Sequence, residues 1–343
     1  MKPIVILTAL EVERVAVEKH LTSIDTVYHP GTGTDYKKGT FKLNNGNILD
    51  IMVGRTDQTN VNAALETERA IEHFQPEYIF FVGVAGGLKD VHVGDIVIGT
   101  SVIGYERGKA EEDNFKPRVQ FGASTYALER LAANYATSDE WKQITNSLVE
   151  TEFSEEIKVL TGTIASGEKV DASHEADLHK YIKQVASHAL AIEMEGLGFL
   201  EVCRMHPSIK SLLLRGISDL VNDKENMDGK GSQPYASQNV SEFLFGLLNN
   251  LDFSRPVEDN PKSQMIEIMC KLYPEGLKDK GIWVNAGGNL AVIQLSATGK
   301  AQWVEAVNIL FKGGGGTTPK SLMTAVLEDF SNNKDVTTLL NKL

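Results

Sequence analysis

The stretch Leu212-Leu213-Leu214-Arg215-Gly216-Ile217-Ser218-Asp219 is an apolar run of strand character that ends in a carboxylate. Two other segments repeat this arrangement after their own apolar runs, Thr8-Ala9-Leu10-Glu11-Val12-Glu13 and Ile192-Glu193-Met194-Glu195-Gly196. In α/β folds, ligands bind where strands end. A carboxylate in such a place is costly to bury unless it binds a partner. The three segments therefore predict functional carboxylates at strand ends.

Working outward, runs typical of strands alternate along the chain with patterns typical of helices. Strands that are buried on both faces and separated by helices indicate a largely parallel or mixed sheet covered by helices. We therefore expect an α/β domain over residues 1–252, in which helices flank a mixed central sheet. The predicted strands are Ile4–Leu7, Ile48–Val53, Tyr78–Val84, Asp95–Ile98, Leu160–Ala165, Leu190–Ile192 and Leu212–Ile217, and the predicted helices include Asn62–Phe74, Glu175–Ala186 and Val240–Leu251.

After this region the composition changes. The stretch Ser254–Lys262 has two prolines and charged residues but little to bury, which is typical of an interdomain linker, here assigned to residues 253–262. Residues 263–343 then predict a small, mainly helical domain, with helices at Gln264–Leu272 and from about Ser321 to Phe330. The four-glycine run Gly313–Gly316 is interpreted as a flexible connection between helices.

Composition limits the classes of function. The 343 residues are 42% hydrophobic and carry a formal net charge of −12, which argues against a surface that binds duplex nucleic acid. The two cysteines, Cys203 and Cys270, form no CxxC pair, so neither a disulfide framework nor a zinc site is expected. The apolar run from Pro3 to Leu10 ends at acids and is interpreted as a first strand. We expect a cytoplasmic protein without a membrane span, metal or organic cofactor.

Each acidic segment also has a purely structural interpretation. Glu11 and Glu13 fall in the first turn of a predicted helix, where the helix dipole favours negative charge, although Glu13 could equally act as a base toward water. The carboxylates of Glu193 and Glu195 suit either a helix N-terminus or the two adjacent hydroxyls of a ribose. Asp219 could cap a helix or protonate a leaving-group nitrogen, two roles that are compatible.

Arg215 lies four positions before Asp219 and is a candidate charge partner for it.

Five motifs in the same order resemble those of the purine nucleoside phosphorylase superfamily, and most of all its methylthioadenosine/S-adenosylhomocysteine nucleosidase branch. The resemblance covers about residues 1–250 and rests on Val82–Leu88, Val93–Ile98, Gly162–Gly167, Glu193-Met194-Glu195-Gly196 and Arg215-Gly216-Ile217-Ser218-Asp219.

This resemblance implies roles for individual residues. Asp219 would protonate or hydrogen-bond N7 of a purine, Glu13 would activate the hydrolytic water, and Glu195 would bind the ribose diol. Met194 would pack on the sugar, and Val170 stands where the family has an aromatic residue near the base. The remaining expected substrate-binding residues of these motifs are Glu193, Ser166, Gly167, Ser218 and Gly86.

The chain departs from the family pattern at two kinds of position. Val84 stands where the nucleosidases usually have a hydroxyl residue, which weakens the case for a phosphorylase. The stretch from Gly54 to Asn60 is polar and contains Arg55, at the start of a predicted helix. Together with Arg107 and Lys109 in a basic loop, Arg55 is a candidate for binding the phosphates of a nucleotide. The alternative is a solvated loop with scattered cations.

The C-terminal region has a resemblance of its own, over residues 263–343. The segments around Gly281–Leu290, Ala301–Ala306, Gly313–Gly316 and Leu327–Phe330 are similar to the small effector-associated adaptor domains of bacterial conflict systems. Those domains resemble death-fold adaptors and pair with a like domain on another protein. The alternative is a helical accessory or oligomerisation domain.

Four hypotheses about function follow. The first is a purine nucleosidase that releases adenine from an adenine nucleotide such as ATP or dATP, as an antiphage effector that a partner protein switches on. The second is a methylthioadenosine/S-adenosylhomocysteine nucleosidase, and the third is a nucleoside phosphorylase, which Glu13 disfavours by its charge near the phosphate. The fourth is a non-catalytic nucleotide sensor or scaffold. The superfamily resemblance also implies a homo-oligomer.

Overall fold

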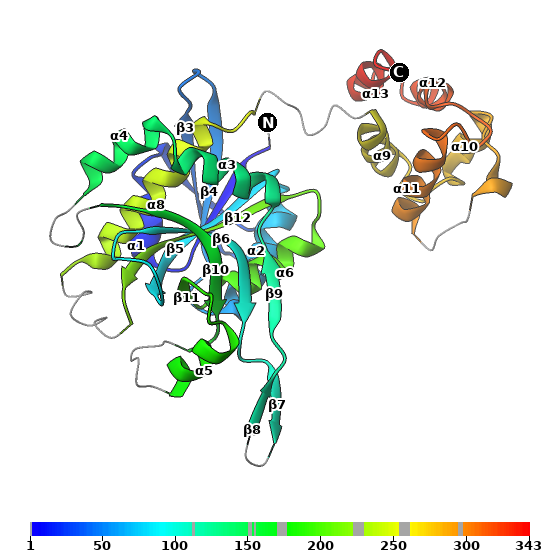
Figure 1. The fold of residues 1–343 in the computed structure, drawn as a ribbon. Coiled ribbons are helices and arrows are strands. Elements are labelled where there is room, and N and C mark those ends of the chain that lie inside the picture. The colour runs from blue at the N-terminus through cyan, green and yellow to red at the C-terminus, as the bar shows by residue number, and fades with distance from the viewer. Residues whose placement is uncertain are drawn as a thin grey trace. The chain divides into compact units, whose positions relative to one another are not determined.

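The computed structural model describes residues 2–111, 114–149, 153, 156–169, 177–221, 230–253, 261–293 and 298–343. The chain divides into two compact units, one up to Leu251 and one from Asp252 onward, and each has its own hydrophobic core (Figure 1). Of the predicted linker, residues 254–260 lie outside the described part of the chain, and Pro261 and Lys262 already belong to a helix.

The first unit is built on one large mixed sheet. Its strands follow the spatial order β11-β10-β6-β12-β5-β1-β4-β3-β2, and β9 pairs with β6. Their bounds are β1 Ile4–Thr8, β2 Thr22–Tyr28, β3 Asp35–Lys42, β4 Ile48–Arg55, β5 Tyr78–Gly87, β6 Ile96–Gly104, β9 Gln120–Ala123, β10 Val159–Ser166, β11 Ala191–Glu193 and β12 Lys210–Asp219, while β7 (Gly108–Glu111) and β8 (Asn114–Pro117) form a separate hairpin.

Helices cover both faces of this sheet (Figure 1). On one face α8 contacts β12 and β5 and also packs on α1, and on the other face α2 packs on α6. The helices of the unit are α1 Glu11–Glu18, α2 Asn60–Phe74, α3 Tyr126–Ala136, α4 Asp139–Leu148, α5 Asp177–Val185, α6 Gly196–Met205 and α8 Ser232–Asn249. The expected α/β architecture is therefore confirmed.

The central strands are apolar because they are covered on both sides. Every residue of β1 is buried, as is every residue of β12 after Lys210. Strands β4, β1, β5 and β12 run parallel to one another, whereas β12 is antiparallel to β6. All seven predicted strand segments fall within or overlap observed strands, which confirms that such runs mark the core of the sheet.

Two features of the sheet bring separate strand ends together. The short strand β11 pairs in parallel with β10 and antiparallel with β5, so that the sheet curls back on itself. In addition, the pairing of β12 with β5 shifts register between Ile217 and Asp219, and such an irregularity redirects the side chain that follows it. The ends of β5, β11 and β12 consequently meet.

The second unit is helical. Its helices are α9 Pro261–Leu272, α10 Ile282–Asn285, α11 Gly299–Leu310, α12 Pro319–Asp329 and α13 Lys334–Leu340, with 3₁₀ turns η1 at Asp279–Gly281 and η2 at Leu290–Val292. Trp283 and Trp303 are fully buried in its core, and the Trp303 indole donates a hydrogen bond to the Tyr273 carbonyl oxygen at 2.8 Å.

The four-glycine run of this unit forms a defined turn. Gly313, Gly315 and Gly316 have φ values of +82°, +88° and +80°, a region that favours glycine, and a Cβ at Gly315 would lie 3.2 Å from the Trp283 ring. The run connects α11 to α12, as expected, and its flexibility stays a prediction. Among the described residues of both units, no helix has the length and apolar character needed to cross a membrane.

Candidate functional site

A cleft of about 140 Å³ opens where β1, β5, β11 and β12 end. The three acidic segments meet there, because each contributes at least one carboxylate to the wall. The lining residues are Ala9, Leu10, Glu13, Gln58, Val84, Ala85, Gly86, Lys169, Ile192, Glu193, Met194, Glu195, Ser218, Asp219 and Gln233.

Glu13 occupies the first turn of α1, as expected, but its carboxylate turns inward and is buried. One oxygen, Oε2, accepts hydrogen bonds from the backbone N–H groups of Ala9 and Leu10 at 2.7 and 2.8 Å. The other, Oε1, accepts from the N–H of Val84 at 2.8 Å. Burial raises the pKa of Glu13, while the nearby Arg215 and these three backbone bonds oppose the rise. A fixed carboxyl with a raised pKa is suited to act as a base.

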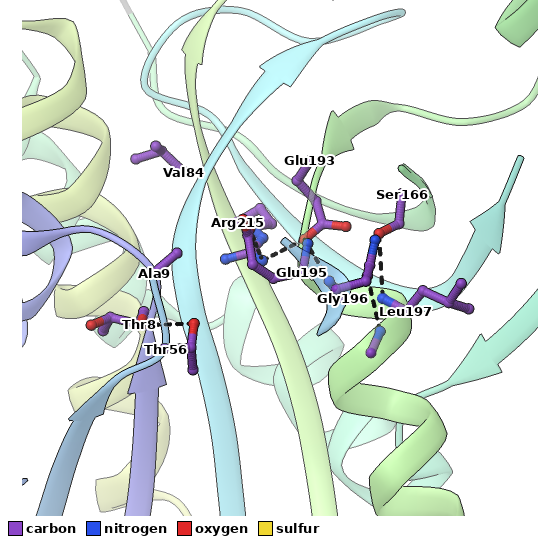
Figure 2. A network of polar contacts seen from close by, with 12 residues as sticks. Thr8, Ala9, Thr56, Val84, Ser166, Glu193, Glu195, Gly196, Leu197 and Arg215 are labelled. Atoms are coloured by element: carbon purple, nitrogen blue, oxygen red, sulfur yellow. Dashed lines mark hydrogen bonds and ion pairs between the residues drawn. The ribbon is translucent and has the colours of Figure 1, made fainter. Parts of the chain in front are cut away.

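Arg215 lies at the centre of the site and is completely buried. Its Nη2 donates to Oε2 of Glu193 at 2.5 Å and to Oε2 of Glu195 at 3.2 Å. Figure 2 shows its side chain reaching from β12 toward these two carboxylates. Its guanidinium also lies 4.6 Å from the centre of the Phe81 ring. The predicted pairing of Arg215 with Asp219 is not among the ion pairs observed, and Glu193 and Glu195 are its partners instead.

A missing side chain at Gly83 creates the room for this arrangement. A Cβ there would lie 2.2 Å from Nη1 of Arg215 and 2.7 Å from Oε1 of Glu13. Within the described part of the chain, Nη1 and Nε of Arg215 have no hydrogen-bond acceptor, and neither does Oε1 of Glu193 have a donor. The cluster therefore contains buried polar atoms without partners among the described residues.

Charge in this cluster does not balance. Glu13, Glu193 and Glu195 face one guanidinium, so full ionisation would leave two uncompensated buried negative charges. Burial is the main reason that the pKa of Glu195 rises to about 8; the charges of Glu193 and Glu13 add to the rise, while Arg215 opposes it. The raised pKa favours the protonated form of Glu195 near neutral pH.

The backbone around Glu193 and Glu195 fixes both carboxyls. Oε2 of Glu193 accepts from the N–H groups of Glu195 and Gly196 at 3.0 and 2.7 Å, at the start of α6. Oε1 of Glu195 accepts from the N–H of Thr59 at 3.3 Å. Backbone donors and Arg215 thus hold both side chains. Hydroxyl groups of a ligand could donate hydrogen bonds to the carboxylate of Glu195 once it has lost its proton.

Asp219 ends β12 at another part of the cleft. Its Oδ2 accepts a hydrogen bond from the Ser218 hydroxyl at 3.0 Å, and its Oδ1 accepts from the N–H of Val221 at 3.0 Å. Gly86 lies opposite on β5, where a Cβ would come within 3.2 Å of Oδ1. The absence of a side chain at Gly86 thus leaves room beside the Asp219 carboxyl group in the cleft wall.

The remaining predicted residues lie at different distances from the cleft. Met194 lines it, whereas Ser166 and Gly167 support the site from behind and are absent from its lining. The Ser166 hydroxyl donates to Oδ1 of Asn60 at 3.0 Å, and Nδ2 of Asn60 donates to the Gly167 carbonyl oxygen at 3.2 Å. Val170 lies outside the described residues.

The predicted basic residues do not line the cleft. Arg55 is half-exposed and paired with Glu11 and Asp57, while Arg107 and Lys109 are exposed, at the base of the β7–β8 hairpin and within it. Among the described residues, the cation that lines the cleft is Lys169, whose Nζ is 3.1 Å from Oε1 of Glu106. The sequence interpretation had overlooked Lys169, although it directly follows the Ser166-Gly167-Glu168 loop.

Nor is the N-terminus of α2 free to bind phosphate, as the sequence had suggested. The N–H of Thr59 donates to Glu195, and the N–H of Asn60 donates to Oε1 of Glu168 at 3.2 Å. Acidic side chains from distant parts of the chain therefore occupy the positions that an anion would take.

Three chemical functions are consequently available in one cleft. Glu13 provides a buried base, the carboxyls of Glu193 and Glu195 provide acceptors for hydroxyl donors, and Asp219 provides an acid or a hydrogen-bond partner for a ring. No group of three or more His, Cys, Asp or Glu side chains with the geometry of a metal site occurs among the residues whose positions are described.

Comparison with known proteins adds to this geometry. Residues 3–249 match the family model of the phosphorylase superfamily. The chain is 27% identical over 212 residues to a 5′-methylthioadenosine/S-adenosylhomocysteine nucleosidase from Haemophilus ducreyi, a match that covers 61% of this chain and 83% of the relative.

Two longer relatives are ATP nucleosidases. One from Escherichia coli is 27% identical over 233 residues, which are 63% of this chain and 45% of the relative. A death domain-containing ATP nucleosidase from Amphimedon queenslandica is 25% identical over 222 residues, which are 60% of this chain and 40% of the relative. The aligned regions therefore span less than half the length of these two proteins.

Solved structures share the fold of the first unit. Futalosine hydrolase from Helicobacter pylori superposes with a TM-score of 0.58 at 23% identity, covering 73% of this chain and 98% of that structure. The 5′-methylthioadenosine/S-adenosylhomocysteine nucleosidase from Neisseria meningitidis superposes with a TM-score of 0.57 at 20% identity, covering 73% of this chain and all of that structure.

Proposed function

Because the match over residues 3–249 covers more than half of the chain, the protein belongs to the phosphorylase superfamily, and we propose that it is a nucleosidase that hydrolyses the N-glycosidic bond of an adenine nucleotide. The observation that carries this proposal is the meeting of Glu13, Glu195 and Asp219 in one cleft. Nucleosidases among the relatives support the same reaction class.

The reaction follows from the charges that develop. As the bond between C1′ of the ribose and N9 of the purine breaks, positive charge grows on the sugar and negative charge on the base. Asp219 donates a proton or a hydrogen bond to N7 of the leaving base. Glu13 accepts a proton from water, whose oxygen bonds to C1′. Interactions that strengthen as these charges appear lower the barrier.

Ribose binding gives Glu195 and its neighbours a role. The two adjacent hydroxyls of a ribose donate hydrogen bonds to a carboxylate, which favours the ionised form of Glu195. The resulting negative charge lies beside the sugar, where the positive charge of the transition state develops. Arg215 keeps Glu193 and Glu195 in place without contacting the substrate, so it is a positioning residue.

Water, and not phosphate, is the nucleophile that the cleft favours. A phosphorylase must bind an anion next to C1′, but four carboxylates line this cleft, Glu13, Glu193, Glu195 and Asp219, against Lys169 in the lining and the buried guanidinium of Arg215 beside it. Phosphate would be repelled there, whereas neutral water would not. This charge argument ranks hydrolysis above phosphorolysis.

For the substrate we propose ATP or dATP. The rim of the cleft is polar, with Gln58, Lys169 and Gln233 beside the acids, which is unlike a pocket built for an apolar thioether. Two relatives at 25–27% identity are ATP nucleosidases. The second candidate is a methylthioadenosine/S-adenosylhomocysteine nucleosidase, which a relative at 27% identity favours.

The experiment measures free base released from ATP, dATP, AMP, adenosine and methylthioadenosine, with and without phosphate. Each incubation is run beside the Asp219→Asn variant. Adenine released from the triphosphates without phosphate, and absent with the variant, is the expected result. Release from methylthioadenosine alone would replace the proposal with a salvage nucleosidase, and release only with phosphate would indicate a phosphorylase. Binding of intact nucleotide without turnover would indicate a sensor.

The helical unit from Asp252 onward is proposed to bind a partner protein and to make the enzyme an effector in antiphage defence. Its closed core supports an independent domain. Phages should form fewer plaques on bacteria that express the full chain than on bacteria that express Asp219→Asn. Equal plaque numbers would contradict the defence role but leave the chemistry intact.

We also propose a homo-oligomer, as the superfamily resemblance implies. Light scattering of the purified chain during gel filtration should give a multiple of the 37.6 kDa chain mass. A monomer mass across the working concentration range would contradict the expectation.

A further inference from the structure

A second hollow, of about 330 Å³, lies beside the catalytic cleft. Four cationic side chains converge on it from four elements, Arg14 from α1, Lys37 from β3, Arg55 from the end of β4 and Arg69 from α2. The reaction proposed above uses none of them.

The two hollows are neighbours. Leu10 lines the cleft and the next residue, Glu11, lines the second hollow. In the same way Gln58 lines the cleft and the preceding Asp57 lines the hollow. No residue separates the two linings in either segment, so the boundary between the hollows, here called the ridge, is formed by Leu10–Glu11 and by Thr56–Thr59.

The ridge has an unusual backbone. Asp57 and Thr59 have φ values of +57° and +97°, which side chains other than glycine rarely adopt. The segment Thr56–Thr59 is anchored at both ends, because the Thr56 N–H donates to the Thr8 carbonyl oxygen at 2.8 Å and the Thr59 N–H donates to Oε1 of Glu195. Such strain persists where surrounding contacts enforce it, and it is concentrated at ligand sites.

We propose that the second hollow binds the 5′ phosphates of the nucleotide whose base and ribose occupy the cleft. This inference rests on the proposed function and assigns it a phosphate subsite. In the cleft, Asp219 takes the base and Glu195 the ribose diol, so the 5′ carbon must leave over the rim. At the rim, Leu10 and Gln58 adjoin Glu11 and Asp57 of the second hollow.

The ion pairs in the hollow show which cation can change partners. Nη1 of Arg55 lies 3.2 Å from Glu11 and its Nε lies 3.1 Å from Asp57, and these two acids are 53% and 70% exposed. Exposed pairs of this kind contribute little to stability. Arginine binds phosphate through stronger, charge-assisted and often paired hydrogen bonds. Arg55 can therefore exchange its carboxylates for a phosphate.

The other arginines are held in place. Arg14 lies 2.6 Å from both Glu11 and Glu18 on its own helix. Arg69 lies 3.1 Å from Glu66, which is almost fully buried and hydrogen-bonded to the Tyr36 hydroxyl. These two side chains stay with their acids, and Arg55 is the group that exchanges partners.

The hollow should bind phosphates only when they are attached to a base and a ribose. Its four cations face four acids, Glu11, Asp35, Asp57 and Glu66, so it carries no net charge at neutral pH. Attachment to a nucleoside in the cleft raises the local concentration of the phosphates. Inorganic tripolyphosphate is therefore expected to be a poor inhibitor.

Two variants with opposite expected effects test the inference. Arg55→Gln should lower the ratio of kcat/KM for ATP to kcat/KM for adenosine by about 10- to 100-fold, the usual range for bonds to a charged group. Glu11→Gln removes a competitor for Arg55 and should raise the same ratio about 2- to 5-fold. Arg204→Gln is the matched control, because Arg204 is an exposed arginine on α6 that lines neither hollow.

The outcomes separate this inference from the proposed function. If wild type releases adenine from ATP but Arg55→Gln and Glu11→Gln both keep the wild-type ratio within twofold, the hollow is not the phosphate subsite and the nucleosidase proposal stands. If wild type releases no adenine from ATP, the proposed function is wrong. Calorimetric titration then tests the phosphate subsite independently of turnover, by comparing ATP binding to Asp219→Asn with ATP binding to the double variant Asp219→Asn/Arg55→Gln. Equal affinity of the two proteins, or no binding to Asp219→Asn, would overturn the phosphate subsite.

Discussion

Replacing Asp219 by asparagine should remove activity while leaving stability almost unchanged. An asparagine keeps both hydrogen bonds described for this side chain, since its carbonyl oxygen can accept from the Val221 N–H and its amide can donate to the Ser218 hydroxyl. The free energy of unfolding should therefore change by less than ~1 kcal/mol. Turnover should fall by ~10²–10⁴-fold, the usual contribution of a general acid.

Asp95 provides a matched control, because it is also fully buried but lies outside the cleft. Its two oxygens accept from the N–H groups of His92 and Lys158, both at 2.8 Å. Asn at this position has one acceptor for two donors, so Asp95→Asn should lower the free energy of unfolding by ~1–3 kcal/mol. Turnover per folded molecule should stay at the wild-type level.

Adenine release from ATP and urea unfolding, measured on wild type and both variants, give the comparison. The reasoning is refuted if Asp219→Asn retains turnover within about tenfold of wild type. It is also refuted if the two variants lose the same stability, because the argument depends on which of their hydrogen bonds an amide can preserve.

Three further predictions follow from the same site. Glu13→Gln leaves one amide oxygen in place of the two carboxylate oxygens that accept from three backbone N–H groups. Adenine release should fall ~10²–10⁴-fold, and urea unfolding should show that the free energy of unfolding is lower by ~1–3 kcal/mol. Near-wild-type turnover would exclude Glu13 as the base. Burial raises the pKa of Glu195 from 4.5 to about 8 in the folded state, so between these pH values the folded state keeps a proton that the unfolded state loses. The free energy of unfolding of wild type should therefore fall between pH 5 and 8 by up to ~1.4 kcal/mol per pH unit relative to that of Glu195→Gln. Parallel plots of unfolding free energy against pH for the two proteins would contradict this. In Gly198→Ala the new Cβ would lie 1.9 Å from the Asn60 carbonyl oxygen, so Tm should drop and the free energy of unfolding should fall by ~1–3 kcal/mol. An unchanged Tm would mean that α2 and α6 can move apart to accept the methyl group without loss of stability.

The architecture was predictable because the central strands carry their signal locally. Residues of β5 and β12 are buried from both sides, and an apolar run is what such burial requires. The edge strand β2 and its neighbour β3 gave no such signal. Almost every residue of β2 is exposed, and its sequence, Thr22–Tyr28, alternates too little to distinguish it from a loop.

Much of the candidate site was also predictable, since its acids follow those same strands. The partner of Arg215 was not. Residues 215 and 219 are on one extended strand, which separates them by about 13 Å and prevents a direct pair. Glu193 and Glu195 reach Arg215 because β11 closes back onto β5, a tertiary pairing that no local pattern encodes.

The occupants of the α2 N-terminus were unpredictable for the same reason. Glu168 and Glu195 are more than 100 positions away from the amides that they bind. Sequence reasoning saw a polar segment at a helix start and inferred an anion site. In the structure, the carboxylates of Glu195 and Glu168 bind these N–H groups in place of an external anion.

The single guanidinium shared by Glu13, Glu193 and Glu195 also bears on how this family can diverge. Loss of Arg215 alone would leave three buried acids without their guanidinium, and loss of one acid would change the charge balance of the others. Substitutions within the cluster are therefore strongly interdependent. Changing Glu13, Glu193, Glu195 and Arg215 one at a time would therefore be destabilising at each step. We expect natural relatives to keep all four residues or to have exchanged them together for apolar residues.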